Sequence, residues 1–225
     1  MTKSEATVAD LKEIIALVDS NEYEAALKKH LWFYEASRET PGMAGVRLSY
    51  ALESWVELGD KYAPAKDALV RVRNSNKKQL LDGKGTFDNF HDLSSINDYL
   101  NDSDDSHLVF LELQKSSPLL AKRCYSVAER TLVKKKDYAA CAPYVINPEK
   151  RYEYIEKIDV VNEKHLKDTP DHAKADFLDY KEKSYTEDVC RLIQILVNLD
   201  QIEKAHSVQK RALLYKRNTE IEDAL

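Results

Sequence analysis

Apolar residues recur along this chain at the three- and four-residue spacing that gives a helix one apolar face. The first such stretch predicts a helix over residues 7–19, with a stripe formed by Val8, Leu11, Ile14, Ile15 and Val18. The same pattern predicts helices over 22–37, 42–58, 63–75, 87–100, 104–116, 118–135, 137–145, 148–167, 170–198 and 200–217. No stretch alternates between apolar and polar residues as a strand would. The pattern therefore predicts an all-α fold, and the short joints between the helices predict antiparallel neighbours.

Capping side chains followed by proline predict several helix starts. A side-chain oxygen at the N-cap accepts a bond from a free backbone N–H, and proline at the next position lacks the N–H that would have no partner. Four pairs fit this description: Thr40-Pro41, Ser117-Pro118, Asn147-Pro148 and Thr169-Pro170. Pro64 is expected to open another helix and Pro143 to close one. The fourth helix could continue as far as Leu81, and residues 81–86 are predicted to form a loop.

Composition supports helices joined by short polar turns. The chain has only 5 glycines in 225 residues, and none follows Gly85. Hairpin turns of β-structure and phosphate-binding loops both depend on glycine. The three cysteines are widely spaced, no apolar leader opens the chain, and no 18-residue apolar run occurs, so we expect a cytoplasmic protein without a membrane span.

Four segments share one turn design, at residues 21–27, 59–65, 136–141 and 199–205. In each, an apolar helix is followed by a polar turn, an aromatic or aliphatic residue and then a small residue. The small residues are Ala26, Ala65, Cys141 and Ala205, which would let two helices approach closely, while Tyr23, Tyr62 and Tyr138 would fill the space over the turn. This design resembles the inter-helix turn of the tetratricopeptide repeat.

The resemblance implies antiparallel helix hairpins stacked into a right-handed α-α superhelix. It covers about half of the chain, and its spacing departs from the family period of roughly 34 residues. An irregular helical bundle is the alternative. We expect one helical-repeat domain over 1–225, possibly subdivided into 1–82 with repeat-like hairpins, 86–145 with central helix pairs, and 147–225 with long helices.

Candidate catalytic and metal-binding motifs are incomplete. Residues 82–86 resemble part of a phosphate-binding loop, but Gly85 stands where that motif has serine or threonine. Residues 101–106 are rich in aspartate, yet Ser106 stands where a calcium loop has glycine, so we expect these acids to cap the following helix. The six histidines form no zinc motif, and the cysteines lie among apolar residues. We therefore expect neither an enzyme nor a cofactor or metal.

One helix offers a candidate peptide-binding stripe. On the predicted helix 118–135, one side presents Arg123, Ser126, Arg130 and Lys134. In folds like the tetratricopeptide repeat, the first helix of each pair lines a concave groove, so this stripe could bind a carboxylate or an acidic peptide. The equivalent residues of the second copy, Ser49, Glu53 and Glu57, do not provide a matching clamp. A plain solvated face is the alternative reading.

The end of the chain is basic, with Lys204, Lys210, Arg211, Lys216 and Arg217 on or near the last helix. Nucleic acid could bind there, but the net charge of −5 disfavours it, and cations also stabilise a helix C-terminus. The apolar face of this helix could instead cap the stack or form a homo-oligomer.

The leading hypothesis is a non-catalytic scaffold that binds a protein or peptide in a helical groove. The rival is an enzyme or small-ligand binder with an inter-helix pocket, and nucleic-acid binding through residues 204–217 is the weaker alternative.

Overall fold

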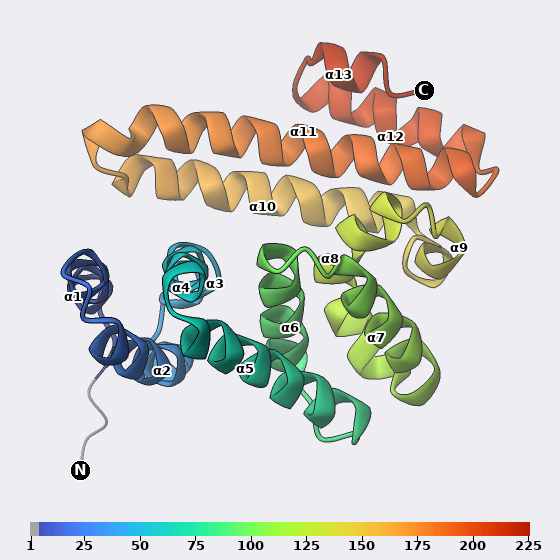
Figure 1. Cartoon of the computed structure of the whole chain (residues 1–225). Helices are drawn as coiled ribbons and strands as arrows, with labels where there is room; N and C mark the ends of the chain where they lie inside the picture. The colour runs from blue at the N-terminus through green and yellow to red at the C-terminus, as the bar shows by residue number, and fades with distance from the viewer. Residues whose placement is uncertain (1–4) are drawn as a thin grey trace. The chain divides into compact units, whose positions relative to one another are not determined.

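The computed structural model describes residues 5–225, which contain helices and no β-strand (Figure 1). The α-helices are α1 (Val8–Asp19), α2 (Tyr23–Glu39), α3 (Ala44–Leu48), α4 (Tyr50–Lys61), α5 (Ala63–Leu81), α6 (Phe87–Tyr99), α7 (Ser103–Ser116), α8 (Pro118–Lys134), α9 (Tyr138–Cys141), α10 (Pro148–Asp168), α11 (Lys174–Asn198), α12 (Ile202–Tyr215) and α13 (Thr219–Glu222). Two 3₁₀ helices, η1 (Ala142–Tyr144) and η2 (Asp171–Ala173), precede α10 and α11. The predicted all-α fold is confirmed. Within residues 5–225, no helix combines the length and apolar character needed to cross a bilayer.

The chain divides into two compact units, residues 1–128 and 129–225, and the boundary falls inside α8. In the first unit, α4 and α5 pack on each other, and α5 also contacts α6 and α7. In the second unit, α10, α11 and α12 contact one another and α13 packs on α11 and α12. The expected single helical-repeat domain, with possible divisions near residues 82 and 145, stays a prediction.

The core of the first unit is built around two aromatic side chains. Trp55 is buried and donates from its indole Nε1 to the carbonyl oxygen of Ala65 at 3.0 Å, which ties α4 to the start of α5. The ring of Tyr34 meets the Trp55 ring edge-on, with centroids 6.1 Å apart. Burying such large apolar side chains is the main stabilising contribution to a small helical unit.

The second unit combines an aliphatic core with buried ion pairs. Its largest buried side chain is Tyr152 of α10, whose hydroxyl lies 2.9 Å from that of Tyr185 on α11. Glu129 is completely buried and accepts two hydrogen bonds from the guanidinium of Arg151, at 3.0 and 3.1 Å. Such a charge is tolerated in an interior because its partner compensates it.

Four hairpins share one turn, in which a non-glycine residue adopts the left-handed conformation. These residues have φ between 58° and 63° and are Asn21, Asn101, Lys136 and Asp200. In each turn the next residue donates its N–H to the carbonyl five positions back, at 2.8 to 2.9 Å, and that residue is also the N-cap of the following helix. This is a Schellman motif fused to a helix start. Three of the four predicted turns have it, and the turn after α6 is an additional copy.

The predicted turn at residues 59–65 is different. Gly59 lies inside α4, and a Cβ added there would meet the Cβ of Lys66 at 3.2 Å. The turn itself is made by Tyr62, which has φ −143° and ψ 97° and joins α4 directly to α5. Gly59 therefore permits close packing of the two helices and does not supply a turn. Ala65 at the start of α5 is buried, and the rings of Tyr23 and Tyr62 stack on each other with their centroids 6.1 Å apart.

The predicted helix over 42–58 is wrong in one respect, because it breaks at Ser49. Ser49 has φ −125° and ψ −95°, and it separates α3 from α4. Its hydroxyl donates to the carbonyl oxygen of Gly45 at 2.7 Å, and its own carbonyl accepts from the hydroxyl of Tyr99 at 3.1 Å. Serine side chains commonly compete with helical hydrogen bonds in this way. The break changes the direction of the chain immediately after Arg47.

Two predicted helix starts are also wrong, at Thr40 and Thr169. Both threonines end a helix: their hydroxyls donate to carbonyls four residues earlier, of Ala36 at 2.9 Å and of His165 at 2.8 Å. A threonine before proline can thus close a helix, because the residue before proline favours an extended backbone. At Asn147 the prediction holds, since its side chain accepts from the N–H of Lys150 at 3.1 Å.

The aspartates near residue 102 act mainly as ion-pair partners of α5. Asp102 is the N-cap of α7, but its side chain makes no capping hydrogen bond. Its Oδ2 instead accepts from Arg73 at 2.7 Å, and Asp105 pairs with Lys77. The acids do lie at the start of α7 as expected, with Asp102 at the N-cap and Asp104 and Asp105 in the first turn, but Asp102 makes no side-chain capping bond. Asp102 and Asp105 join α7 to α5.

Candidate functional site

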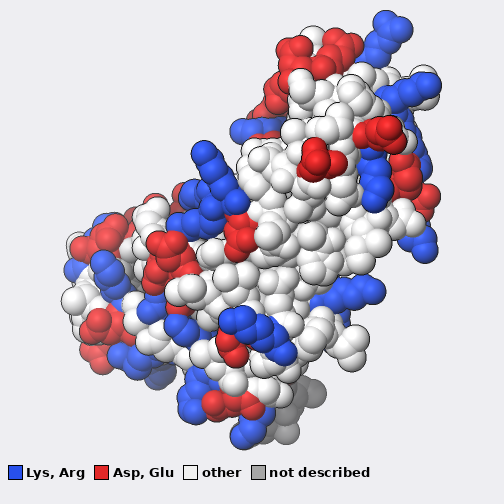
Figure 2. All heavy atoms as spheres, turned by 90° about the vertical axis from the view of Figure 1, so that its right-hand side faces the viewer, with Lys and Arg blue, Asp and Glu red and all other residues white. Residues whose placement is uncertain are grey.

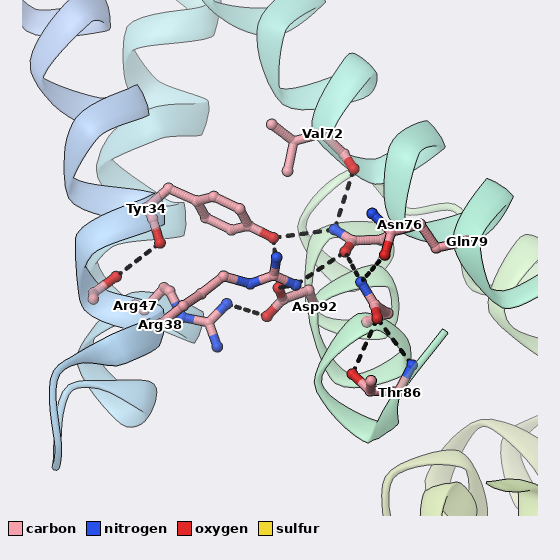
Figure 3. A network of polar contacts seen from close by, with 10 residues as sticks. Tyr34, Arg38, Arg47, Val72, Asn76, Gln79, Thr86 and Asp92 are labelled. Carbon is pink, nitrogen blue, oxygen red and sulfur yellow. Dashed lines mark hydrogen bonds and ion pairs between the residues drawn. The ribbon is translucent and has the colours of Figure 1, made fainter. Parts of the chain in front are cut away.

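A buried polar network lies where α2, α3, α5 and α6 of the first unit meet (Figure 3). Its centre is Asp92 of α6, which is completely buried. The Asp92 carboxylate accepts from the hydroxyl of Tyr34 at 2.5 Å and pairs with the guanidinium of Arg38 at 2.6 Å. Arg47, which lies on the short helix α3 just before the break at Ser49, pairs with the other carboxylate oxygen. One carboxylate thus joins two helices, α2 and α3, to α6.

Asn76 extends the network into α5. Its amide nitrogen donates to the Tyr34 hydroxyl at 3.0 Å and to the carbonyl of Val72 at 3.1 Å. Its amide oxygen accepts from Arg38 at 3.1 Å and from Asn89 at 2.8 Å. Asn89 also accepts from the N–H of Thr86 at 2.9 Å, which caps the start of α6. The network therefore fixes side-chain positions through several shared hydrogen bonds.

The network carries an excess of positive charge. One carboxylate faces two guanidinium groups, Arg38 and Arg47, and both also lie over the ring of Tyr34 with 5.4 Å to its centroid. Burial and the Asp92 charge raise the pKa of the Tyr34 hydroxyl, so Tyr34 stays neutral and donates a hydrogen bond to Asp92. Burial also lowers the pKa of the neighbouring His91, which disfavours a further positive charge beside the two guanidinium groups. Asp92 therefore supplies one negative charge to two guanidinium groups.

Arg38 also forms part of a surface groove between α2 and α5. The groove has a volume of about 400 Å³ and is lined by Leu31, Tyr34, Glu35, Arg38, Ala68, Arg71, Val72, Ser75, Asn76 and Gln79. Tyr34, Ala68 and Asn76 are buried and form its floor, whereas Leu31 of α2 and Arg71 of α5 are exposed. The groove thus has a floor held by hydrogen bonds and walls of mixed polarity. It is suited to binding and holds no evident nucleophile–base pair.

No family model, curated protein or solved structure matches the chain.

The predicted stripe on α8 is exposed along its length. Arg123 and Ser126 lie in the first unit, and Arg130 and Lys134 lie in the second. Arg130 forms an ion pair with Glu187 of α11 at 3.5 Å. The stripe stays a prediction.

The basic end of the chain is largely compensated by acids of its own unit. Arg211 pairs with Glu149 and Glu156, at 3.3 and 2.6 Å, and Lys216 pairs with Asp159 at 2.9 Å and with Glu182 at 3.1 Å. On the face drawn in Figure 2, Lys and Arg side chains are interspersed with Asp and Glu. This arrangement differs from the continuous basic surface that nucleic-acid binding favours.

The described histidines and cysteines are candidates for a metal-binding or nucleophilic site. Within residues 5–225, no cluster of three His, Cys, Asp or Glu side chains could hold a metal ion. His30 is buried against Trp55, with ring centroids 5.2 Å apart, and its Nε2 lies 3.3 Å from the Ser54 hydroxyl. Burial raises the pKa of the Cys124 thiol to about 12, which disfavours a nucleophilic role.

The sequence analysis missed the α2–α5 groove and the network beneath it. One signal was present: Asp92 falls within the buried stripe of α6, between Phe90 and Leu93. A charged residue on the apolar face of a helix indicates a buried ion pair. Its partners could not be found this way, because Arg47 and Tyr34 lie 45 and 58 residues away along the chain.

Proposed function

We propose that the protein is a non-catalytic interaction scaffold, a stack of helix hairpins similar to tetratricopeptide repeats, which binds a segment of a partner protein in the α2–α5 groove. The observation that carries the proposal is the groove itself. Its exposed walls supply both apolar and polar contacts, while hydrogen bonds among Tyr34, Asn76 and Asp92 fix its floor. A preformed floor lowers the entropy lost on binding.

The size of the groove suits a short segment. On α2 the lining residues run from Leu31 to Arg38, two helical turns or about 10 Å, and on α5 they run from Ala68 to Gln79, about 16 Å. An extended peptide advances about 3.3 Å per residue, so roughly three to five residues would occupy the groove. Contacts of this extent are typical of peptide recognition by grooves between helices.

The test is a selection of random twelve-residue peptides on the full chain, followed by affinity measurements on one groove variant and one control. Ser75 is exposed in the groove, so Ser75→Trp should fill the groove without disturbing the core. Ser126 is an equally exposed helical serine on the predicted α8 stripe, so Ser126→Trp is the matched control. We expect selected peptides to bind the wild-type chain and Ser126→Trp but to lose measurable binding to Ser75→Trp.

Two results would contradict the proposal. If no peptide is selected and native mass spectrometry finds a small molecule on the purified chain, the protein is an enzyme or a small-ligand binder. If Ser126→Trp abolishes binding and Ser75→Trp does not, the α8 stripe of Arg123, Ser126, Arg130 and Lys134 is the binding surface.

A further inference from the structure

Arg71 is a cation of the groove without a partner among the described residues. It is exposed on α5, and neither a hydrogen bond nor an ion pair engages it within residues 5–225. Its helix neighbour Arg73 shows the contrast, since it pairs with Asp102 at 2.7 Å. A guanidinium group has five N–H donors that match a carboxylate in geometry. All of those of Arg71 are available to a ligand.

Arg38 supplies a second cation, which is held in place from below. Its side chain is 26% exposed, and its bonds to Asp92 and Asn76 both come from the same terminal nitrogen, Nη2. Arg38 lines the groove, and none of its nitrogen atoms is buried without a hydrogen-bond partner. Because Asp92 is shared with Arg47, the attraction of Arg38 for an anion is only partly satisfied.

The negative charge in and beneath the groove is smaller than the positive charge. Glu35 is an exposed carboxylate on α2 that attracts Arg38 through space. Together, Arg38, Arg47 and Arg71 carry three positive charges against the two negative charges of Glu35 and Asp92. The groove therefore attracts anions, although the whole chain has a net charge of −5.

Apolar side chains lie beside these cations. Leu31 is 40% exposed on α2, and Val72 of α5 is partly buried in the groove. They offer contact to an aliphatic side chain of a bound segment. Leu31 precedes Arg38 by two helical turns, which is about 10 Å, or the length of three residues of extended chain.

We infer that the segment bound in the α2–α5 groove is acidic: carboxylates of the partner protein bind the guanidinium groups of Arg38 and Arg71, and an aliphatic side chain of the same segment packs on Leu31 and Val72. The inference rests on the proposed function and adds the chemistry of the partner. Charge complementarity of this kind governs specificity and association rate.

The experiment measures fluorescence anisotropy of the tightest selected peptide with the full chain. Arg71→Gln and Arg71→Glu remove and reverse the charge of a side chain that has no hydrogen-bond or ion-pair partner among residues 5–225. Arg123→Gln and Arg123→Glu are the matched controls, because Arg123 is also exposed on a helix and also has no partner among residues 5–225. We expect selected peptides to be rich in Asp and Glu, and Arg71→Gln to weaken binding about tenfold or more. Arg71→Glu should weaken it further, and both Arg123 variants should bind like the wild type.

The peptide provides an independent arm. Replacing its acidic residues by Gln should weaken binding to the wild type but have less effect with Arg71→Gln, and raising the salt concentration should weaken only the acidic form.

Three results would overturn the inference. If the selected peptides are neutral or basic and bind Arg71→Glu as well as the wild type, the groove is not an anion site, although a loss of binding in Ser75→Trp would still support the scaffold. If the Arg123 variants lose binding while the Arg71 variants keep it, the carboxylate binds on α8. If the chain dimerises and Ser75→Trp returns it to a monomer, the occupant is a second copy of this chain.

Discussion

The Asp92 network makes a sharp prediction about the stability of the first unit. Asp92→Asn keeps the shape of the side chain but removes its charge. It leaves Arg47, which is 4% exposed, and the partly buried Arg38 without an anionic partner. The asparagine oxygen could still accept one hydrogen bond, from Tyr34 or from one guanidinium group.

The expected loss is large compared with the stability of a small unit. Removing one member of a buried ion pair typically costs about 3–5 kcal/mol, mainly because the other charge stays buried without compensation. The free energy of unfolding of an ordinary domain is about 5–15 kcal/mol. We therefore expect Asp92→Asn to lower the free energy of unfolding by about 3–5 kcal/mol while the unit still folds at room temperature.

Tryptophan fluorescence during urea unfolding is the appropriate assay. The chain has two tryptophans, Trp32 and Trp55, and both belong to the first unit, so their signal follows that unit alone. Asp88→Asn is the matched control, because Asp88 is an exposed aspartate of the same helix, and it should cost less than about 1 kcal/mol.

A double-mutant cycle tests the cause of the loss. Arg47→Met removes one guanidinium group. The loss of unfolding free energy in the double variant Asp92→Asn/Arg47→Met should be smaller than the sum of the losses in the two single variants, because the second change removes a charge that the first left unpaired. A loss below about 1 kcal/mol in Asp92→Asn, or strict additivity in the double variant, would refute the reasoning.

The remaining predictions concern protonation, thiol access and turn geometry. Burial lowers the pKa of His30 to about 4, below its ordinary value of 6.5, so the unfolded chain takes up this proton first as the pH falls. The stability that neutral His30 contributes should be intact above pH 6.5, and the free energy of unfolding should decrease by about 3 kcal/mol between pH 6.5 and pH 4. Urea unfolding at several pH values should show this decrease, and the His30→Phe variant should lack it. With a thiol-reactive disulfide reagent at pH 8, the partly exposed Cys190 should react in the folded chain, whereas the buried Cys124 should react only after unfolding; equal rates would contradict the burial. Lys136 has φ 58°, so Lys136→Gly should stabilise the chain by about 0.5–1 kcal/mol in thermal unfolding and Lys136→Val should destabilise it.

The helices were predictable because their apolar spacing is local. Helix α1, for example, begins and ends within one residue of its predicted bounds, since Leu11, Ile14 and Val18 are all buried on one face. The break at Ser49 was not predictable, because it depends on the hydroxyl of Tyr99, which is 50 residues away. The same limit applied at Thr40: a hydroxyl that can cap either end of a helix does not reveal from sequence which end it serves.

The turns explain how a chain with so few glycines forms tight hairpins. At Asn21, Asn101 and Asp200 the left-handed position is taken by Asn or Asp, the residue types other than glycine that adopt it most readily. The hydrogen bond across each Schellman turn and the immediate start of the next helix compensate for the conformational strain. A search for the turn glycine of a repeat consensus therefore overlooks the α6–α7 turn, although its geometry is the same as that of the other three.

The buried network and the groove depend on each other physically. A guanidinium on the surface keeps most of its rotational freedom, and ordering it on binding costs roughly 0.5–1.5 kcal/mol. Arg38 has lost much of that freedom before any ligand arrives, because Asp92 and Asn76 hold one of its nitrogens. Asp92 in turn can lie in the interior because Arg38 and Arg47 both pair with its carboxylate. The same ion pairs that hold α2, α3 and α6 together thus leave Arg38 rigid, partly exposed and incompletely neutralised, which are the properties that a carboxylate-binding residue needs.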